Sequence, residues 1–174
     1  MNKKTGIILA VVIANIVLVG TVVTLYFTVL HDDDQVEEGK IIITGLVDQQ
    51  INLTLVDLEM MPNITREYTI LGNPDIIDDY TGVPLEYLIT VVANVTENYR
   101  ITVYALDGLA KYFYLNDIIA NPGFIIAYKR GGEYLKSLSE GGNGPFRLIV
   151  PEEYNTYNGQ LCVKYVSEIE ILDL

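Results

Sequence analysis

An uninterrupted apolar segment near the N-terminus constrains this chain more than any other feature of its sequence. From Thr5 to Leu30 there is no Asp, Glu, Lys, Arg or His. As a helix, this segment would extend roughly 39 Å, more than the roughly 30 Å hydrocarbon layer of a membrane. It is also longer than the apolar region of about 7 to 15 residues in a cleavable signal peptide. A buried core helix would need a domain wrapped around it, and the remaining chain is too small for that. We therefore predict a retained transmembrane anchor within residues 1–31.

The charges on either side of the apolar segment predict its orientation. Lys3 and Lys4 precede it, and the acidic residues 32–34 follow it. The positive-inside rule then keeps the N-terminus in the cytoplasm. We expect a single-pass protein of the cell membrane, with residues 32–40 as an acidic stalk and residues 41–174 as one extracytoplasmic domain.

The charge and the cysteine content exclude several functions. The formal net charge is −12, and two of the 11 basic residues precede the apolar segment, so the exposed part is strongly acidic. Nucleic acid is therefore excluded as a partner, because its binding is mostly phosphate neutralisation. Cys162 is the only cysteine, so no internal disulfide and no cysteine-based zinc site can form. The single histidine, His31, lies beside the predicted anchor, which argues against a histidine-based catalytic triad in the domain.

Three segments fit the acceptor pattern for N-glycosylation, and the predicted topology would expose them to a glycosylating compartment. They are Asn52-Leu53-Thr54, Asn63-Ile64-Thr65 and Asn94-Val95-Thr96.

The hydrophobic pattern from Ile41 onward indicates an α+β domain that is mostly β. Runs of β-branched and aromatic residues predict strands at 41–47, 66–71, 101–105, 111–115, 124–128, 146–150 and 161–171. The last strand changes register after Tyr165, which indicates a bulge. Helical spacing predicts short helices at 55–61, 85–92 and 116–120, the first with a capping-box-like start at Thr54 and Asp57. Residues 48–50 are expected to form a turn and residues 75–79 an acidic loop.

Several short phrases of the sequence, taken in their order, resemble the oxidoreductase molybdopterin-binding domain, the fold of sulfite oxidase and its bacterial relatives. The resemblance covers about Ile41 to Ile171 and implies a sulfite-oxidase-like fold. The phrases are Thr44-Gly45-Leu46-Val47, the helix Leu55 to Pro62, Tyr80-Thr81-Gly82-Val83-Pro84-Leu85, Ala105-Leu106-Asp107-Gly108, Gly144-Pro145-Phe146-Arg147-Leu148-Ile149-Val150-Pro151, and Val163-Lys164-Tyr165-Val166 with Ile169-Glu170.

The resemblance also nominates residues that face a cofactor. In the family, an arginine and a lysine of the last two phrases help to hold the pterin and its phosphate, which implies this role for Arg147 and Lys164. Fixed cations suit a phosphate-bearing ligand. The backbone amides of Gly142-Asn143-Gly144 are further candidates for cofactor binding. Gly142 stands where the family has a histidine, and Tyr165 replaces its usual tryptophan.

The family's metal-binding cysteine has no counterpart here. In the family this residue lies near the end of the second strand, and the matching stretch is Leu71-Gly72-Asn73, which carries no sulfur. A metal centre of this kind relies on a soft thiolate ligand. Cys162 lies in the last predicted strand, and we expect it to be a buried, inert thiol. The resemblance therefore implies a member that keeps the fold without the usual metal chemistry.

Three hypotheses follow for the function. The first is a membrane-anchored, non-catalytic module that binds a pterin-like or other small ligand, or a redox partner protein. The second is an active molybdopterin-dependent oxidoreductase that holds its cofactor without the cysteine. The third is a structural cell-surface domain. The first two predict that Arg147 and Lys164 line one open pocket near residues 71–73, whereas the third needs only an exposed apolar patch.

Overall fold

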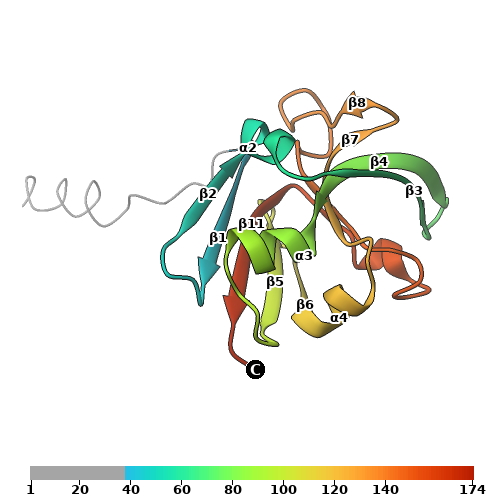
Figure 1. Ribbon diagram of the computed structural model, residues 1–174. Coiled ribbons are helices and arrows are strands. Elements are labelled where there is room, and N and C mark those ends of the chain that lie inside the picture. The colour runs from blue at the N-terminus through green and yellow to red at the C-terminus, as the bar shows by residue number, and fades with distance from the viewer. Residues whose placement is uncertain (1–37) are drawn as a thin grey trace, which may run out of the picture. The chain divides into compact units, whose positions relative to one another are not determined.

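The strands form two sheets in the computed structural model of the chain, which describes residues 38–174 (Figure 1). No helix in this part of the chain is long and apolar enough to cross a membrane. The predicted anchor and most of the predicted stalk lie outside the described residues. The orientation and the membrane location therefore stay predictions.

The first sheet joins the two ends of the domain. Its strands lie in the order β2 (Ile51–Thr54), β1 (Lys40–Gly45), β11 (Val166–Leu172), β5 (Arg100–Ala105) and β6 (Ala110–Tyr114). The first strand, β1, pairs in parallel with the last strand, β11, and the other pairs are antiparallel. The strands predicted at 101–105 and 111–115 form a hairpin across Asp107-Gly108, in which Tyr104 pairs with Ala110.

The second sheet is antiparallel throughout. Its strands lie in the order β10 (Val163–Lys164), β9 (Arg147–Ile149), β7 (Ile125–Arg130), β4 (Ile76–Pro84) and β3 (Ile64–Ile70), and β8 (Glu133–Tyr134) pairs with β7. β3 and β4 form a hairpin whose tip projects beyond the sheet (Figure 1).

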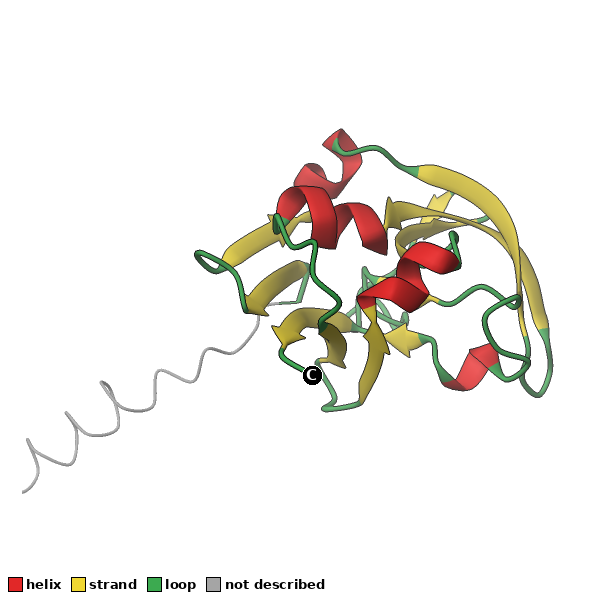
Figure 2. Ribbon diagram, turned by 60° about the horizontal axis from the view of Figure 1, so that its bottom comes forward, coloured by secondary structure: helices red, strands yellow, loops and turns green. Residues whose placement is uncertain are grey.

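The helices are short beside the strands (Figure 2). They are α2 (Leu55–Met60), α3 (Leu85–Tyr87), which continues as the π-helical turn η1 (Leu88–Val92), α4 (Leu115–Ala120) and the 3-10 turn η2 (Asn158–Gln160). The predicted capping box is present at the start of α2: the Thr54 hydroxyl accepts from the Asp57 amide, and the Asp57 carboxylate accepts from the Thr54 amide at 2.7 Å. The predicted α+β fold that is mostly β is confirmed.

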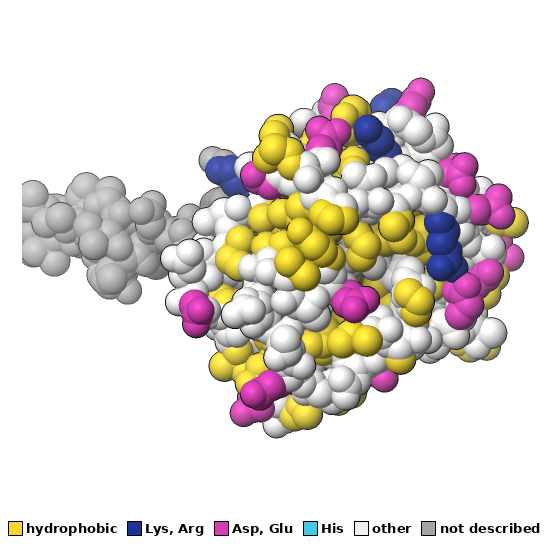
Figure 3. All heavy atoms as spheres, viewed as in Figure 1, with side chains coloured by type: hydrophobic (Ala, Val, Ile, Leu, Met, Phe, Trp, Pro, Cys, Tyr) yellow, Lys and Arg dark blue, Asp and Glu magenta, His cyan; other side chains and the backbone are white. Residues whose placement is uncertain are grey.

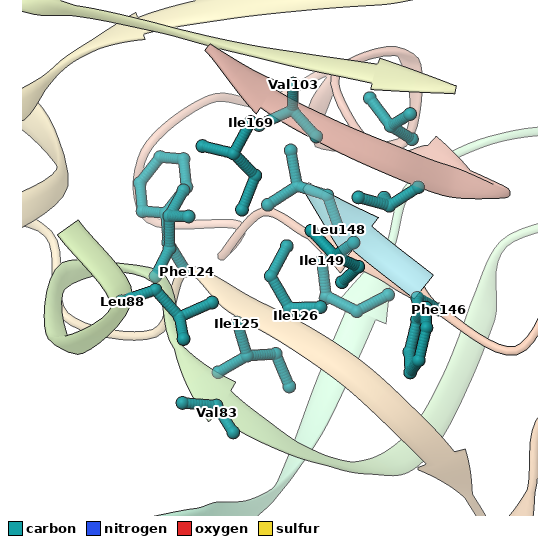
Figure 4. Packing of buried hydrophobic residues seen from close by; sticks show 14 of the residues in the cluster. Val83, Leu88, Val103, Phe124, Ile125, Ile126, Phe146, Leu148, Ile149 and Ile169 are labelled. Carbon is teal, nitrogen blue, oxygen red and sulfur yellow. The ribbon is translucent and has the colours of Figure 1, made fainter. Parts of the chain in front are cut away.

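The hydrophobic core lies between the two sheets. Figure 4 shows Val103 and Ile169 of the first sheet close to Ile126 and Leu148 of the second, and all four are fully buried. Leu88 of η1 is also fully buried and closes one side. An alternating strand pattern buries one face of each sheet, so a two-layer core follows from the sequence pattern.

The predicted strand at 161–171 is wrong in one respect. The structure divides it into β10, which belongs to the second sheet, and β11, which belongs to the first. The chain turns at Tyr165, which has a positive φ of 56°, and its amide donates to the Asn143 carbonyl at 3.2 Å. The change of register seen in the sequence therefore marks mainly a passage between sheets, with a smaller irregularity at Val166.

Two further expectations need correction. Residues 75–79, expected as an acidic loop, belong largely to β4, where the Asp78 carboxylate accepts from Arg130 Nε at 2.7 Å. The paired charge lets an acidic segment extend the hairpin with β3. The short strand β2 was not predicted, because four residues with only two apolar side chains give little alternating signal.

Candidate anion-binding pocket

A pocket of about 640 Å³ lies where the tip of the β3–β4 hairpin meets η2 and the strands β9 and β10. This volume is within the range of about 300 to 1,000 Å³ that small-molecule sites occupy. The lining residues are Ile70, Leu71, Gly72, Asn73, Pro74, Asp75, Ile76, Arg147, Thr156, Tyr157, Gly159, Gln160 and Lys164.

Arg147 and Lys164 line this pocket together. They lie directly opposite each other on the antiparallel strands β9 and β10, so their side chains leave the same face of the sheet. Neither forms an ion pair with any residue in 38–174. Two like charges in this position repel each other, and a bound anion would remove that repulsion. The structure therefore brings the two nominated cations to the stretch Leu71-Gly72-Asn73.

Arg147 is buried to an unusual degree for a charged residue. Its exposed fraction is 6%, and its Nη1 donates to the Tyr80 hydroxyl at 3.3 Å. Its guanidinium carbon lies 5.8 Å from the centroid of the Tyr80 ring. Nε has no hydrogen-bond partner among the residues that the structure describes. A buried donor left unsatisfied costs about 1–3 kcal/mol, and more for a charged group, so this guanidinium is poised to bind an anionic acceptor.

The second sheet supports the orientation of Arg147. Tyr80 is fully buried in β4 and packs edge-on against Tyr68 of β3, with ring centroids 6.1 Å apart. The Tyr68 hydroxyl donates to the Gly123 carbonyl at 2.8 Å, and burial raises the pKa of Tyr68 to about 12. Tyr68 therefore stays neutral at physiological pH, and its ring packs against Tyr80 behind the guanidinium.

Asn158 joins the two walls of the pocket. Its side chain is fully buried, and Oδ1 accepts from the Leu71 amide at 2.9 Å. Nδ2 donates to the carbonyls of Thr69 at 2.7 Å and Val150 at 3.0 Å. One side chain thus connects the end of β3 to η2 and to the segment after β9. Sequence reasoning missed this residue, because asparagine in a turn is usually exposed.

One carboxylate also lines the pocket. Asp75 Oδ1 accepts from the Gly72 amide at 2.8 Å, and the Asp75 side chain is exposed. The negative charge of Asp75 repels an anion at the hairpin side of the pocket. An anionic group is therefore favoured on the side of Arg147 and Lys164, with the rest of a ligand extending toward the hairpin.

The Gly142-Asn143-Gly144 segment does not line the pocket. The Gly142 amide donates to the Ser137 carbonyl at 2.8 Å, and a Cβ at Gly142 would lie 2.2 Å from the Lys136 carbonyl oxygen. Gly144 has a φ of +83° and packs against Tyr165. The structure thus places these glycines where the backbone turns tightly beside β10, a supporting position that differs from the expected one at the cofactor.

Cys162 is buried beside this region with an exposed fraction of 7%. Its Sγ accepts from the Val150 amide at 3.4 Å, and burial raises the pKa of the thiol. It is not among the residues that line the pocket. These properties describe a thiol that stays protonated and shielded at neutral pH.

The residues of the pocket fit the phosphate of the cofactor that the resemblance implies, and they do not fit its metal. The unpaired cations Arg147 and Lys164 fit a phosphate group. The stretch Leu71-Gly72-Asn73 offers no sulfur, and within residues 38–174 no three His, Cys, Asp or Glu side chains are grouped to hold a metal ion. The donor set therefore does not fit a metal that needs a soft ligand.

No protein-family model matches the chain, and no curated protein matches it. Among solved structures, the chain is similar to the sulfane dehydrogenase SoxCD from Paracoccus pantotrophus, with a TM-score of 0.61 and 21% sequence identity. The match covers 78% of this chain and 38% of that chain, so this protein spans well under half of the enzyme's length. The similarity supports the sulfite-oxidase-like fold that the sequence phrases implied.

Proposed function

We propose that this protein is a membrane-anchored, extracytoplasmic binding module of sulfite-oxidase-like fold. Its pocket between Arg147 and Lys164 binds a small anionic ligand, for which a phosphate-bearing pterin is the leading candidate. The module acts by binding, without the metal chemistry of full enzymes with this fold.

The buried and incompletely paired Arg147 carries this proposal. A guanidinium that only stabilised the fold would be expected to have a carboxylate partner, and Arg147 has none in the described part of the chain. Lys164 adds a second charge from the neighbouring strand, at the exposed mouth of the pocket. The two groups combine a bidentate donor with a mobile point charge, the pair that suits a phosphate group.

The non-catalytic part of the proposal rests on the chemistry of Leu71-Gly72-Asn73. These residues line the pocket, yet they supply only apolar, backbone and amide groups. The membrane part rests on the sequence alone, through the charge-free segment from Thr5 to Leu30 and the charges that flank it.

An active oxidoreductase remains the second candidate, because the pocket that would bind a pterin ligand would also bind a full cofactor. The specific observation in its favour is that Arg147 and Lys164 face the same stretch that carries the metal ligand in the family. A structural surface domain, in contrast, has no need for a pocket lined by two unpaired cations.

The metal and pterin content of the native protein separates these functions. The full chain is purified from the membranes of its own host, and molybdenum and pterin fluorescence after oxidation are measured per polypeptide. We expect an anionic ligand near one per chain with molybdenum far below one per chain. Stoichiometric molybdenum would establish the oxidoreductase and overturn the non-catalytic proposal.

A further inference from the structure

The three acceptor patterns for N-glycosylation have the same pattern of exposure. The asparagines Asn52, Asn63 and Asn94 are all exposed. The middle residue of each pattern turns inward: Leu53 and Val95 are buried, with exposed fractions of 4% and 6%, and the residue after Asn63 is partly buried. In an extended backbone, residues two apart leave the same side of the chain. Asn52 and Thr54 therefore lie on one side of β2, and Asn63 and Thr65 on one side of the chain at the start of β3, whereas Asn94 has a left-handed φ of 57°. The Thr54 hydroxyl is held in the capping box of α2, and the Thr65 hydroxyl lies 2.8 Å from that of Thr81.

The side chains of Asn52 and Asn63 contribute little to the fold, whereas Asn94 has a φ of 57°, a backbone conformation in which asparagine is enriched. Asn52 and Asn63 make only long, exposed hydrogen bonds of 3.3 Å with nearby residues. By comparison, Asn158 is fully buried, and Asn121 Nδ2 donates to the Asp117 carbonyl at 2.8 Å near the end of α4. A sugar added to Asn52 or Asn63 would therefore disrupt only these long, exposed hydrogen bonds.

The acceptors are distributed around β2 and α2. Asn52 lies in β2, and Asn94 lies close to the turn at Gly45–Asp48 that precedes β2. Asn63 directly precedes β3, roughly 23 Å along that strand from the hairpin-tip residues of the pocket. The strand register places its neighbour Ile64 level with Arg147, three strand spacings or roughly 14 Å across the second sheet. In Figures 1 and 2, β2 and the β3–β4 hairpin tip lie on opposite sides of the domain.

We propose that Asn52, Asn63 and Asn94 are N-glycosylated, and that the glycan on Asn52 covers the outer edge of β2. β2 is an edge strand of the first sheet, and such edges invite pairing with other chains unless they are shielded. Bulky, solvated glycans would provide this protection. This inference rests on the extracytoplasmic location in the proposed function.

The modification is a group transfer from a lipid-linked glycosyl phosphate. The Asn Nδ2 bonds to C1 of the sugar, the bond between C1 and the phosphate oxygen breaks, and the lipid phosphate leaves. The amide loses one proton, and no electrons are exchanged with an oxidant or reductant. The chemistry therefore needs only a host transferase and its lipid-linked donor on the outer side of the membrane.

The test uses the full chain from its own host's membranes. Peptide mass spectrometry is applied to the wild type and to Asn52→Gln, Asn63→Gln and Asn94→Gln, with Asn116→Gln as control, because Asn116 is exposed but lies outside any acceptor pattern. A glycan on any of the three acceptors supports the inference, and the matching variant should lose that glycan's mass while the control keeps the full mass. Circular dichroism verifies that the variants fold.

Protease treatment of sealed membrane vesicles is measured in the same preparation, so that the two proposals fail separately. If the domain is extracytoplasmic and none of the three asparagines carries a glycan, this inference is overturned and the proposed location stands. If the domain faces the cytoplasm, both are overturned.

Discussion

At the scale of single residues, Arg147 shows what a family phrase can and cannot predict. The phrase Gly144-Pro145-Phe146-Arg147 nominated the residue, and its strand position opposite Lys164 followed only from the pairing of β9 with β10. Arg147 Nε lacks a hydrogen-bond partner in the described part of the chain, and Arg147 Nη1 donates to the Tyr80 hydroxyl. Both features depend on how strands that are far apart in sequence pack together. No local pattern contains this information, so the chemistry of the site becomes visible only in the folded chain.

Cys162 provides a test of burial at a single position. Burial raises the pKa of its thiol, and the thiolate is the reactive form, so we expect negligible alkylation of the folded protein at neutral pH and complete reaction in denaturant. The measurement is the rate of thiol labelling by a small maleimide in both conditions. Rapid labelling of the native state would show an accessible thiol and contradict the structural assignment.

Tyr68 predicts a decrease of stability at alkaline pH. Its pKa is about 12 in the folded protein, whereas an unfolded tyrosine ionises near pH 10. Between these values the folded state retains a proton that the unfolded state has lost, so the free energy of unfolding falls as pH rises from about 10 to about 12. Burial also raises the pKa of Tyr128 and of Tyr154, which act in the same direction.

The Tyr68→Phe variant isolates this contribution. We expect it to lose about 0.5–1.5 kcal/mol at neutral pH with the hydrogen bond to Gly123, and to show a shallower decrease above pH 10. Urea unfolding across this pH range gives both quantities. Tyr157→Phe is the control, because its side chain is 69% exposed. An unchanged slope in Tyr68→Phe would mean that this hydroxyl does not titrate as described.

At the scale of elements, local signals predicted what local interactions determine. The α2 helix was predicted at its start, because the capping box involves only Thr54 and Asp57. The two strands of the β5–β6 hairpin were also predicted, because β-branched and aromatic residues mark each of them locally. The division of 161–171 into β10 and β11 was not predicted, since an apolar run does not show which sheet each half will join. The walls of the pocket could not be predicted either. Asn158 bonds to Leu71 and Thr69, which lie 87 and 89 positions away from it in the sequence.

Asn158→Ala should loosen the connection between β3 and η2. The substitution leaves the Leu71 amide and the Thr69 and Val150 carbonyls without their partner, and a buried unsatisfied group costs about 1–3 kcal/mol. We therefore expect a loss of several kcal/mol in the free energy of unfolding, measured by urea denaturation. The control Asn155→Ala removes one exposed hydrogen bond to the Tyr157 amide and should cost much less. Equal losses in the free energy of unfolding for the two substitutions would show that Asn158 does not hold β3 and η2 together.

At the scale of the whole molecule, the order of the family phrases and the charge composition predict different properties, the fold and the character of the surface. The order of the family phrases implied the sulfite-oxidase-like fold, and the similarity to sulfane dehydrogenase supports that fold. The excess of acidic residues is visible on the face in Figure 3, where acidic side chains outnumber basic ones around a central apolar region.

The anchor predicts how the full chain behaves in cell fractions. We expect the protein to stay in the membrane pellet after an alkaline carbonate wash and to require detergent for release, because the segment from Thr5 to Leu30 has no charged residue. A chain that begins at Asp32 should instead appear in the soluble fraction. Release of the full chain by carbonate alone would contradict the transmembrane prediction.

The most direct test of the account asks whether Arg147 and Lys164 retain an anionic ligand. Wild-type protein and the variants Arg147→Gln and Lys164→Gln are purified from the native host in parallel with Arg100→Gln, which changes an exposed arginine of the first sheet, and their bound small molecules are quantified by mass spectrometry. A circular dichroism spectrum of Lys164→Gln equal to that of the wild type separates ligand loss from unfolding, because loss of a stabilising ligand by itself lowers the thermal midpoint. We predict one phosphate-bearing compound per wild-type chain, kept by Arg100→Gln and lost or strongly reduced in both pocket variants. Equal ligand content in all four proteins, or none in the wild type, would contradict the account.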